Sequence, residues 1–128
     1  MCMYIGIEDL AANALIWLLQ MKQQQADGQR FVRFSTLLDY GMAVVKKLKK
    51  NGEEATLIYS RDANSLLFSD YSDFFEEVID EAGWSGIKLR ESKTMDDLWR
   101  KFIAPIPVQV QEIMSDERIL VKFLRKAA

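Results

Sequence analysis

Histidine is absent from this 128-residue sequence. Without an imidazole the protein has no Ser-His or Cys-His pair to activate a nucleophile, no histidine ligand for a metal ion and no histidine general base. Cys2 is the only cysteine, so neither an intramolecular disulfide nor a Cys-based metal motif is available. We therefore expect no metal site, no cofactor and no catalytic site of these classes.

Long apolar runs are also missing. The longest, from Leu10 to Leu19, is interrupted by Asn13 and reaches only about half of the roughly 18 residues that a membrane-spanning helix needs. The first ten residues contain Glu8 and Asp9 but no Lys or Arg, unlike a secretory signal. These features predict a cytoplasmic protein with no membrane partner.

What is present is the composition of a folded domain. Hydrophobic residues make up 49% and charged residues 28% of the chain, and neither a repeat nor a Gly/Pro/Ser-rich linker divides it. A chain of this length buries roughly two-thirds of its unfolded surface around one core. We predict a single domain over residues 1–128. The glycine patterns of phosphate-binding and dinucleotide-binding loops are absent.

Hydrophobic periodicity predicts an α+β fold in which helices pack on a small, mainly antiparallel sheet. The expected order is α-β-α-β-β-α-β-α, with helices over about 7–25, 35–50, 69–82 and 94–103 and strands over 30–34, 55–60, 65–69 and 86–90. Strands 55–60 and 65–69 are expected to form a hairpin. The pattern leaves residues 107–126 open between one helix and a hairpin that turns at Ser115-Asp116.

Two local signals mark helix ends. Asn51-Gly52 is typical of a helix stop after residue 50. Thr94 followed by Asp97 resembles a capping box, ahead of a buried stripe that contains Leu98 and Phe102 together with Met95 and Trp99.

Charge is strongly segregated along the chain. Residues 51–91 carry three Lys/Arg against ten Asp/Glu, a net charge of −7 in a protein whose total is −2. Most of these acids lie in the expected helix 69–82, and its outer face is predicted to contain Asp70, Asp73, Glu76, Glu77, Asp80 and Glu81. Neighbouring like charges disfavour an isolated helix, so the pattern indicates either a solvated face or a surface that docks on a basic partner.

The leading functional hypothesis is a non-catalytic, inhibitor-like or regulatory protein that contacts another protein through this acidic helix. Trp84, just beyond the helix end and beside Gly83, is the tryptophan most exposed in the prediction and a candidate interface anchor.

Two alternatives involve nucleic acid. The first is an accessory protein whose phosphate contacts would be Lys46, Lys47, Lys49, Lys50 and Arg61. The order strand, helix, hairpin is loosely similar to a winged helix with Arg61 at the wing tip, but residues 36–50 keep one unbroken apolar face and the pI is about 5.2. The second alternative is a metal-dependent nuclease that uses Glu91 and Lys93 with an upstream Asp70.

The first expected helix also raises a hypothesis of self-association. Only Asn13 and Gln20 are polar between Leu10 and Met21, so part of its surface could remain uncovered within one chain. A homodimer would then place Leu15, Leu18 or Leu19 near the contact, whereas a monomer would place this helix at the centre of the core.

Overall fold

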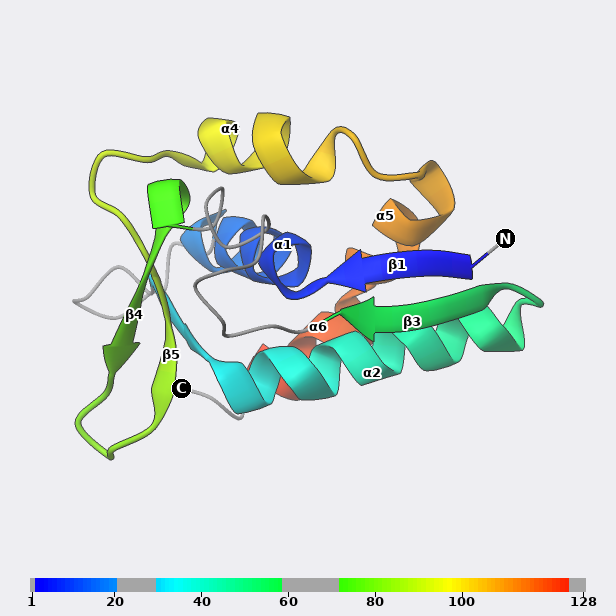
Figure 1. The fold of residues 1–128 in the computed structure, drawn as a ribbon, viewed down its shortest axis with the longest axis horizontal. Helices are drawn as coiled ribbons and strands as arrows, with labels where there is room; N and C mark the ends of the chain where they lie inside the picture. The colour runs from blue at the N-terminus through cyan, green and yellow to red at the C-terminus, as the bar shows by residue number, and fades with distance from the viewer. Residues whose placement is uncertain (1, 21–29, 59–71, 125–128) are drawn as a thin grey trace.

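The computed structural model of the protein describes residues 2–20, 30–58 and 72–124. Helices pack with two small sheets, a three-stranded antiparallel sheet in the order β2-β5-β4 at one end of the molecule and a two-stranded parallel sheet in the order β1-β3 (Figure 1). This confirms the predicted fold class. No helix in these three ranges is long and apolar enough to cross a membrane.

Helix α1 (Ile7–Gln20) lies in the centre of the molecule and follows strand β1 (Cys2–Gly6) without a loop (Figure 1). Its side chains Leu10 and Leu15 are fully buried because other helices pack on both sides of it. The predicted helix extends to residue 25, of which residues 21–25 lie outside the described ranges. Strand β1 was not predicted, since five residues at the start of the chain give too short a pattern.

Strand β2 (Phe31–Arg33) leads directly into helix α2 (Phe34–Lys50), which is one continuous helix as predicted. The helix ends where expected: the amide of Asn51 donates to the carbonyl of Lys47 at 3.1 Å, and Gly52 adopts a φ of 88°. An unbroken α2 contains no helix-turn-helix.

Strand β3 (Glu54–Ile58) corresponds to the first half of the predicted hairpin, but in the described ranges its partner is β1. The two strands run parallel, with Met3 opposite Ala55 and Ile5 opposite Leu57. The other half of that hairpin, residues 65–69, lies outside the described residues.

The predicted acidic helix is wrong over its second half. Residues Phe75–Ile79 form strand β4, which pairs antiparallel with β5 (Ser85–Leu89), and β5 pairs in turn with β2. Phe75, Val78 and Ile79 satisfy a helical stripe, but they are also aromatic and β-branched residues that favour strands. Pairing with β5 decides between the two, because it buries Phe75 against Leu89.

The C-terminal part of the chain is helical. Helix α4 (Met95–Leu98) begins with the predicted capping box between Thr94 and Asp97 and continues into a wider π-helical segment, η1 (Trp99–Ile103). Leu98 and Phe102 are buried as expected, whereas Met95 and Trp99, which were expected on the same stripe, are 37% and 44% exposed. The undecided segment forms two helices, α5 (Val108–Met114) and α6 (Glu117–Leu124), which separate at the position where a hairpin turn was considered.

Candidate functional site

The tip of the β4–β5 hairpin is built around Asp80. Its Oδ1 accepts hydrogen bonds from the backbone amides of Ala82 at 3.0 Å and Trp84 at 2.9 Å. Gly83 completes the turn with a φ of 87°, in the left-handed region that glycine tolerates. The hydrogen bond from the Trp84 amide holds the pKa of Asp80 below its ordinary value, and the Arg33 guanidinium lowers this pKa further. Asp80 therefore holds the tip in shape rather than presenting a free charge.

Arg33 connects this tip to the rest of the sheet. Its Nε lies 2.8 Å from Asp80 Oδ2, and its guanidinium carbon lies 5.5 Å from the ring centroid of Trp84. Because Arg33 ends β2, the tryptophan is positioned by two elements that are far apart in the sequence. These contacts favour one orientation of the indole in the free protein.

Two large apolar side chains are exposed at the tip. Trp84 is 53% exposed, in agreement with the prediction that it shows a face to solvent, and Ile79 is 72% exposed. In the antiparallel register Ile79 lies opposite Ser85, so alternation along the strands places Ile79 and Trp84 on opposite faces of the hairpin. The hairpin lies at one end of the molecule, away from β1 and α5 (Figure 1).

The acidic residues do not form the single surface that the sequence predicts. Glu76 lies across from Lys88 and 3.5 Å from Arg90, and Asp80 is bound by Arg33. Asp73, Glu77 and Glu81 are exposed, and Asp70 lies outside the described residues. At the tip, Glu81 is the exposed carboxylate next to the turn.

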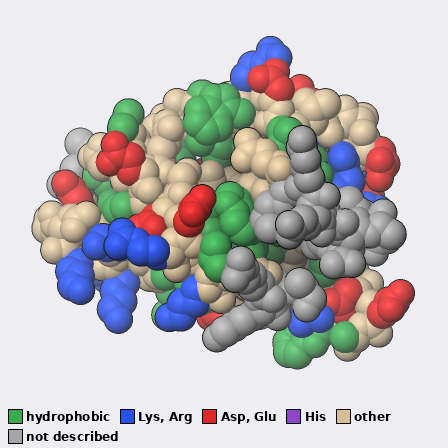
Figure 2. All heavy atoms as spheres, turned by 180° about the vertical axis from the view of Figure 1, so that it is seen from behind, with side chains coloured by type: hydrophobic (Ala, Val, Ile, Leu, Met, Phe, Trp, Pro, Cys, Tyr) green, Lys and Arg blue, Asp and Glu red, His purple; other side chains and the backbone are tan. Residues whose placement is uncertain are grey.

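The basic cluster at the end of α2 is exposed to solvent. Lys46, Lys47, Lys49 and Lys50 all face solvent, whereas Arg61 lies outside the described residues. Figure 2 shows Lys and Arg side chains along one lower edge of the rear face of the molecule, with Asp and Glu near them. The pKa of Asp116 is lowered chiefly by its hydrogen bond from Arg118 and further by the charge of Lys47. At least one lysine of the cluster therefore has a carboxylate nearby.

Two residues of the nuclease hypothesis, Glu91 and Lys93, lie in the described part of the chain, and each contacts a group outside that hypothesis. Glu91 faces the guanidinium of Arg30 at 4.0 Å, and Lys93 Nζ lies 4.4 Å from the ring centroid of Phe74. No group of three or more Cys, Asp or Glu residues that could hold a metal ion occurs within the described part of the chain. The geometry of Glu91 and Lys93 gives no support to metal-dependent hydrolysis.

The residues of the dimer hypothesis are mostly internal. Leu15 is fully buried and Leu18 is 8% exposed within one chain, so neither is available to a second copy. Leu19 is half-buried and packs against the core. Helix α1 is the central element of the core, which was the alternative to the dimer.

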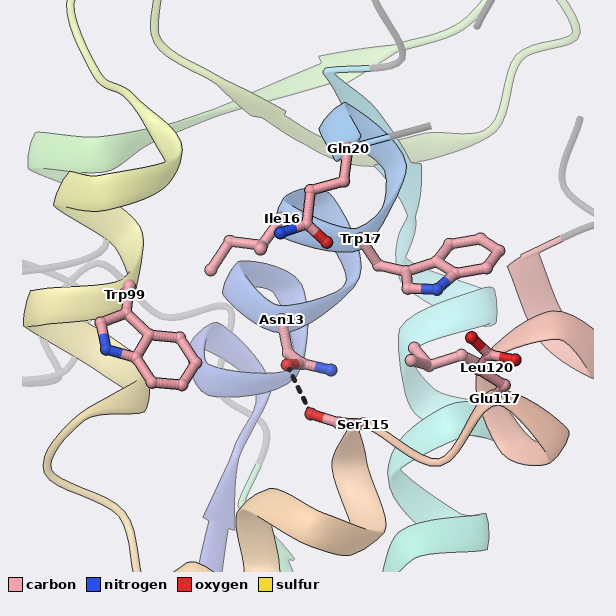
Figure 3. A pocket seen from close by; sticks show the side chains of 8 residues that line it. All are labelled: Asn13, Ile16, Trp17, Gln20, Trp99, Ser115, Glu117 and Leu120. Carbon is pink, nitrogen blue, oxygen red and sulfur yellow. Dashed lines mark hydrogen bonds between the residues drawn. The ribbon is translucent and has the colours of Figure 1, made fainter. Parts of the chain in front are cut away.

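A pocket that the sequence did not predict lies over α1. Its volume is about 280 Å³. It is lined by residues of α1, η1 and the α5–α6 junction, namely Asn13, Ile16, Trp17, Gln20, Trp99, Ser115, Glu117 and Leu120 (Figure 3). The signal for it in the sequence is Asn13, a polar residue in an otherwise apolar helix.

Asn13 joins α1 to two other helices below the pocket. Its Nδ2 donates to the Tyr40 hydroxyl at 2.8 Å and to the Met114 carbonyl at 2.9 Å, and Tyr40 also donates to that carbonyl. Burial raises the pKa of Tyr40, so its hydroxyl remains protonated. Buried polar groups of this kind stabilise the fold only when they are hydrogen-bonded, as these are.

A second unpredicted feature is the carboxylate pair at the start of α1. Glu8 is 7% exposed, and burial together with the neighbouring Glu8 charge raises the pKa of Asp9 from 3.8 to about 7. A hydrogen bond from the Gly6 backbone opposes this shift. Asp9 is the third residue of α1, and its carboxylate accepts the hydrogen bond from the backbone of Gly6, the residue that precedes the helix.

No protein-family model, no curated protein sequence and no solved structure matches this chain.

Proposed function

We propose that the protein is a non-catalytic binding protein that acts through protein-protein contact, with the tip of the β4–β5 hairpin as its contact element. The single observation that supports this most is the exposure of Trp84 on a turn that Asp80 and Arg33 hold in place. Tryptophan is enriched among the residues that contribute most to binding energy. A side chain that is already ordered loses less entropy when it binds.

The chemistry of the tip indicates the kind of partner surface that fits it. Trp84 would enter an apolar depression, and the exposed carboxylate of Glu81 would face a basic rim. This modifies the hypothesis of an acidic helix, since the acids now flank an aromatic anchor on a hairpin. The absence of histidine from the sequence agrees with a binding rather than a catalytic role.

Comparative capture from a lysate of the native host tests the proposal. The immobilised wild-type protein is compared with Trp84→Ala and with Tyr4→Ala, which removes an aromatic side chain of 68% exposure at the far end of the molecule. Circular dichroism and thermal melting establish that both variants are folded.

We expect at least one protein that is captured by the wild type and by Tyr4→Ala but is reduced more than about tenfold with Trp84→Ala, the loss typical of an interface anchor. Identical capture by all three folded proteins would contradict the proposal.

A further inference from the structure

The pocket over α1 has the size of a site for one small chemical group. Its volume of about 280 Å³ lies at the lower limit of small-molecule sites, which begin at about 300 Å³. Trp99 of η1 lies on one side of Asn13, and Trp17 of α1 lies on the other (Figure 3). A nucleotide or another large ligand would exceed this space.

The charge of the lining has one sign. Among the eight lining residues, Glu117 at the start of α6 is the only one with an ionisable side chain, and it is exposed to solvent. Trp17 and Trp99 belong to the lining, and the electron-rich face of an indole ring attracts cations. An anionic ligand would be repelled by the Glu117 carboxylate, whereas a cation would be complementary to it.

Asn13 provides a hydrogen-bond acceptor at the base of the pocket. Both of the partners of its Nδ2, Tyr40 and Met114, lie on the core side, and this orients the amide so that Oδ1 points toward Ser115 (Figure 3). The Ser115 hydroxyl lies 3.4 Å from Oδ1, near the upper limit for a hydrogen bond. Asn13 is only 7% exposed, and its oxygen retains capacity to accept a bond from a ligand N–H.

We infer that this pocket binds an organic cation that carries N–H donors, a guanidinium or alkylammonium group. Glu117 provides the counter-charge, Trp17 and Trp99 provide aromatic surface in the lining, and Asn13 Oδ1 accepts a hydrogen bond from the cation. This site is separate from the hairpin tip, so it stands or falls independently of the proposed partner contact.

Calorimetric titration with a matched pair of probes tests the inference. The cation n-butylguanidinium and its neutral isostere n-butylurea are titrated into the wild-type protein. We expect a dissociation constant of about 1 mM for the cation, a value reasonable for so small a ligand, and binding of the urea weaker by at least about tenfold.

The variants separate charge from shape. Glu117→Gln should reduce the preference for n-butylguanidinium over n-butylurea to less than about threefold. Trp99→Ala should weaken the binding of n-butylguanidinium by about tenfold. Tyr4→Ala, at an exposed position of β1 outside the pocket, should leave the titration unchanged. Equal binding of the two probes, absence of saturable binding, or an unchanged preference in Glu117→Gln would each overturn the inference.

The source of the cation is distinguished by a third probe, the blocked peptide acetyl-Gly-Arg-Gly-amide. Tighter binding of this peptide than of n-butylguanidinium would identify an arginine side chain of a protein as the ligand. Weaker binding of the peptide would identify a free amine or guanidine. Both results support a cation site.

Discussion

Replacement of Asp9 by Asn tests how the burial of the acidic pair affects stability. The Asp9 carboxyl is half-buried beside Glu8 and has a pKa of about 7 in the folded protein, compared with 3.8 for the unperturbed group. An amide has nearly the same shape, and its oxygen can still accept the bond from Gly6. The substitution therefore removes the proton that titrates and keeps the helix start.

The sign of the effect follows from the raised pKa. Below about pH 4 the carboxyl is protonated in both the folded and the unfolded chain and carries no penalty. As the pH rises toward 7, the unfolded chain releases the proton more readily than the folded protein, so the free energy of unfolding falls by about 1.4 kcal/mol per pH unit. Above about pH 7 the full penalty is present, with a ceiling of about 4 kcal/mol.

Urea denaturation of the wild type and Asp9→Asn, followed by tryptophan fluorescence at about pH 5 and about pH 8, measures this difference. Between these two pH values we expect the free energy of unfolding of Asp9→Asn, relative to that of the wild type, to increase by about 2–3 kcal/mol. The reason is that the wild type loses about 1.4 kcal/mol per pH unit over the roughly two units between pH 5 and the pKa of Asp9. Asp39→Asn, at an exposed position of α2, serves as the control. A relative stability that is equal at both pH values, or that decreases with pH, would refute the reasoning.

Three further substitutions have expected outcomes. Tyr40→Phe should lower the free energy of unfolding by about 1–2 kcal/mol, measured by urea denaturation, because the hydroxyl bonds Asn13 and Met114 in the core. Asp80→Ala should speed amide hydrogen exchange at Ala82 and Trp84, since both amides lose their acceptor. Glu81→Lys should change the free energy of unfolding by less than about 0.5 kcal/mol. It should weaken the binding of the captured partner to the hairpin, and added salt should reduce this effect.

Elements with strong local signals were predictable from the sequence. Helix α2 has a wide apolar stripe and a glycine beyond its end, and α4 begins with Thr94 and Asp97 in the capping-box spacing. Trp84 was recognised as exposed because it lies beside Gly83, outside any buried stripe. In each case the information lies within a few consecutive residues.

Elements that depend on a distant partner were not predictable in the same way. Residues Phe75–Ile79 satisfy both helical and strand periodicity, and pairing with β5 makes them a strand. Strand β3 lies next to β1 because the intervening helices bring residue 55 back to residue 3. The pocket is assembled from α1, η1 and the α5–α6 junction, which are separated by most of the chain.

Site-specific photocrosslinking tests the proposed contact most directly. Ala82→p-benzoylphenylalanine places a photoreactive group at an exposed position of the hairpin tip, and Tyr4→p-benzoylphenylalanine places the same group on β1, away from the hairpin (Figure 1). After irradiation in the host lysate, we expect a discrete protein adduct from position 82 that is absent from position 4 and is lost when Trp84→Ala is added. Adducts that form equally from both positions, or that persist without the indole, would contradict the proposed contact.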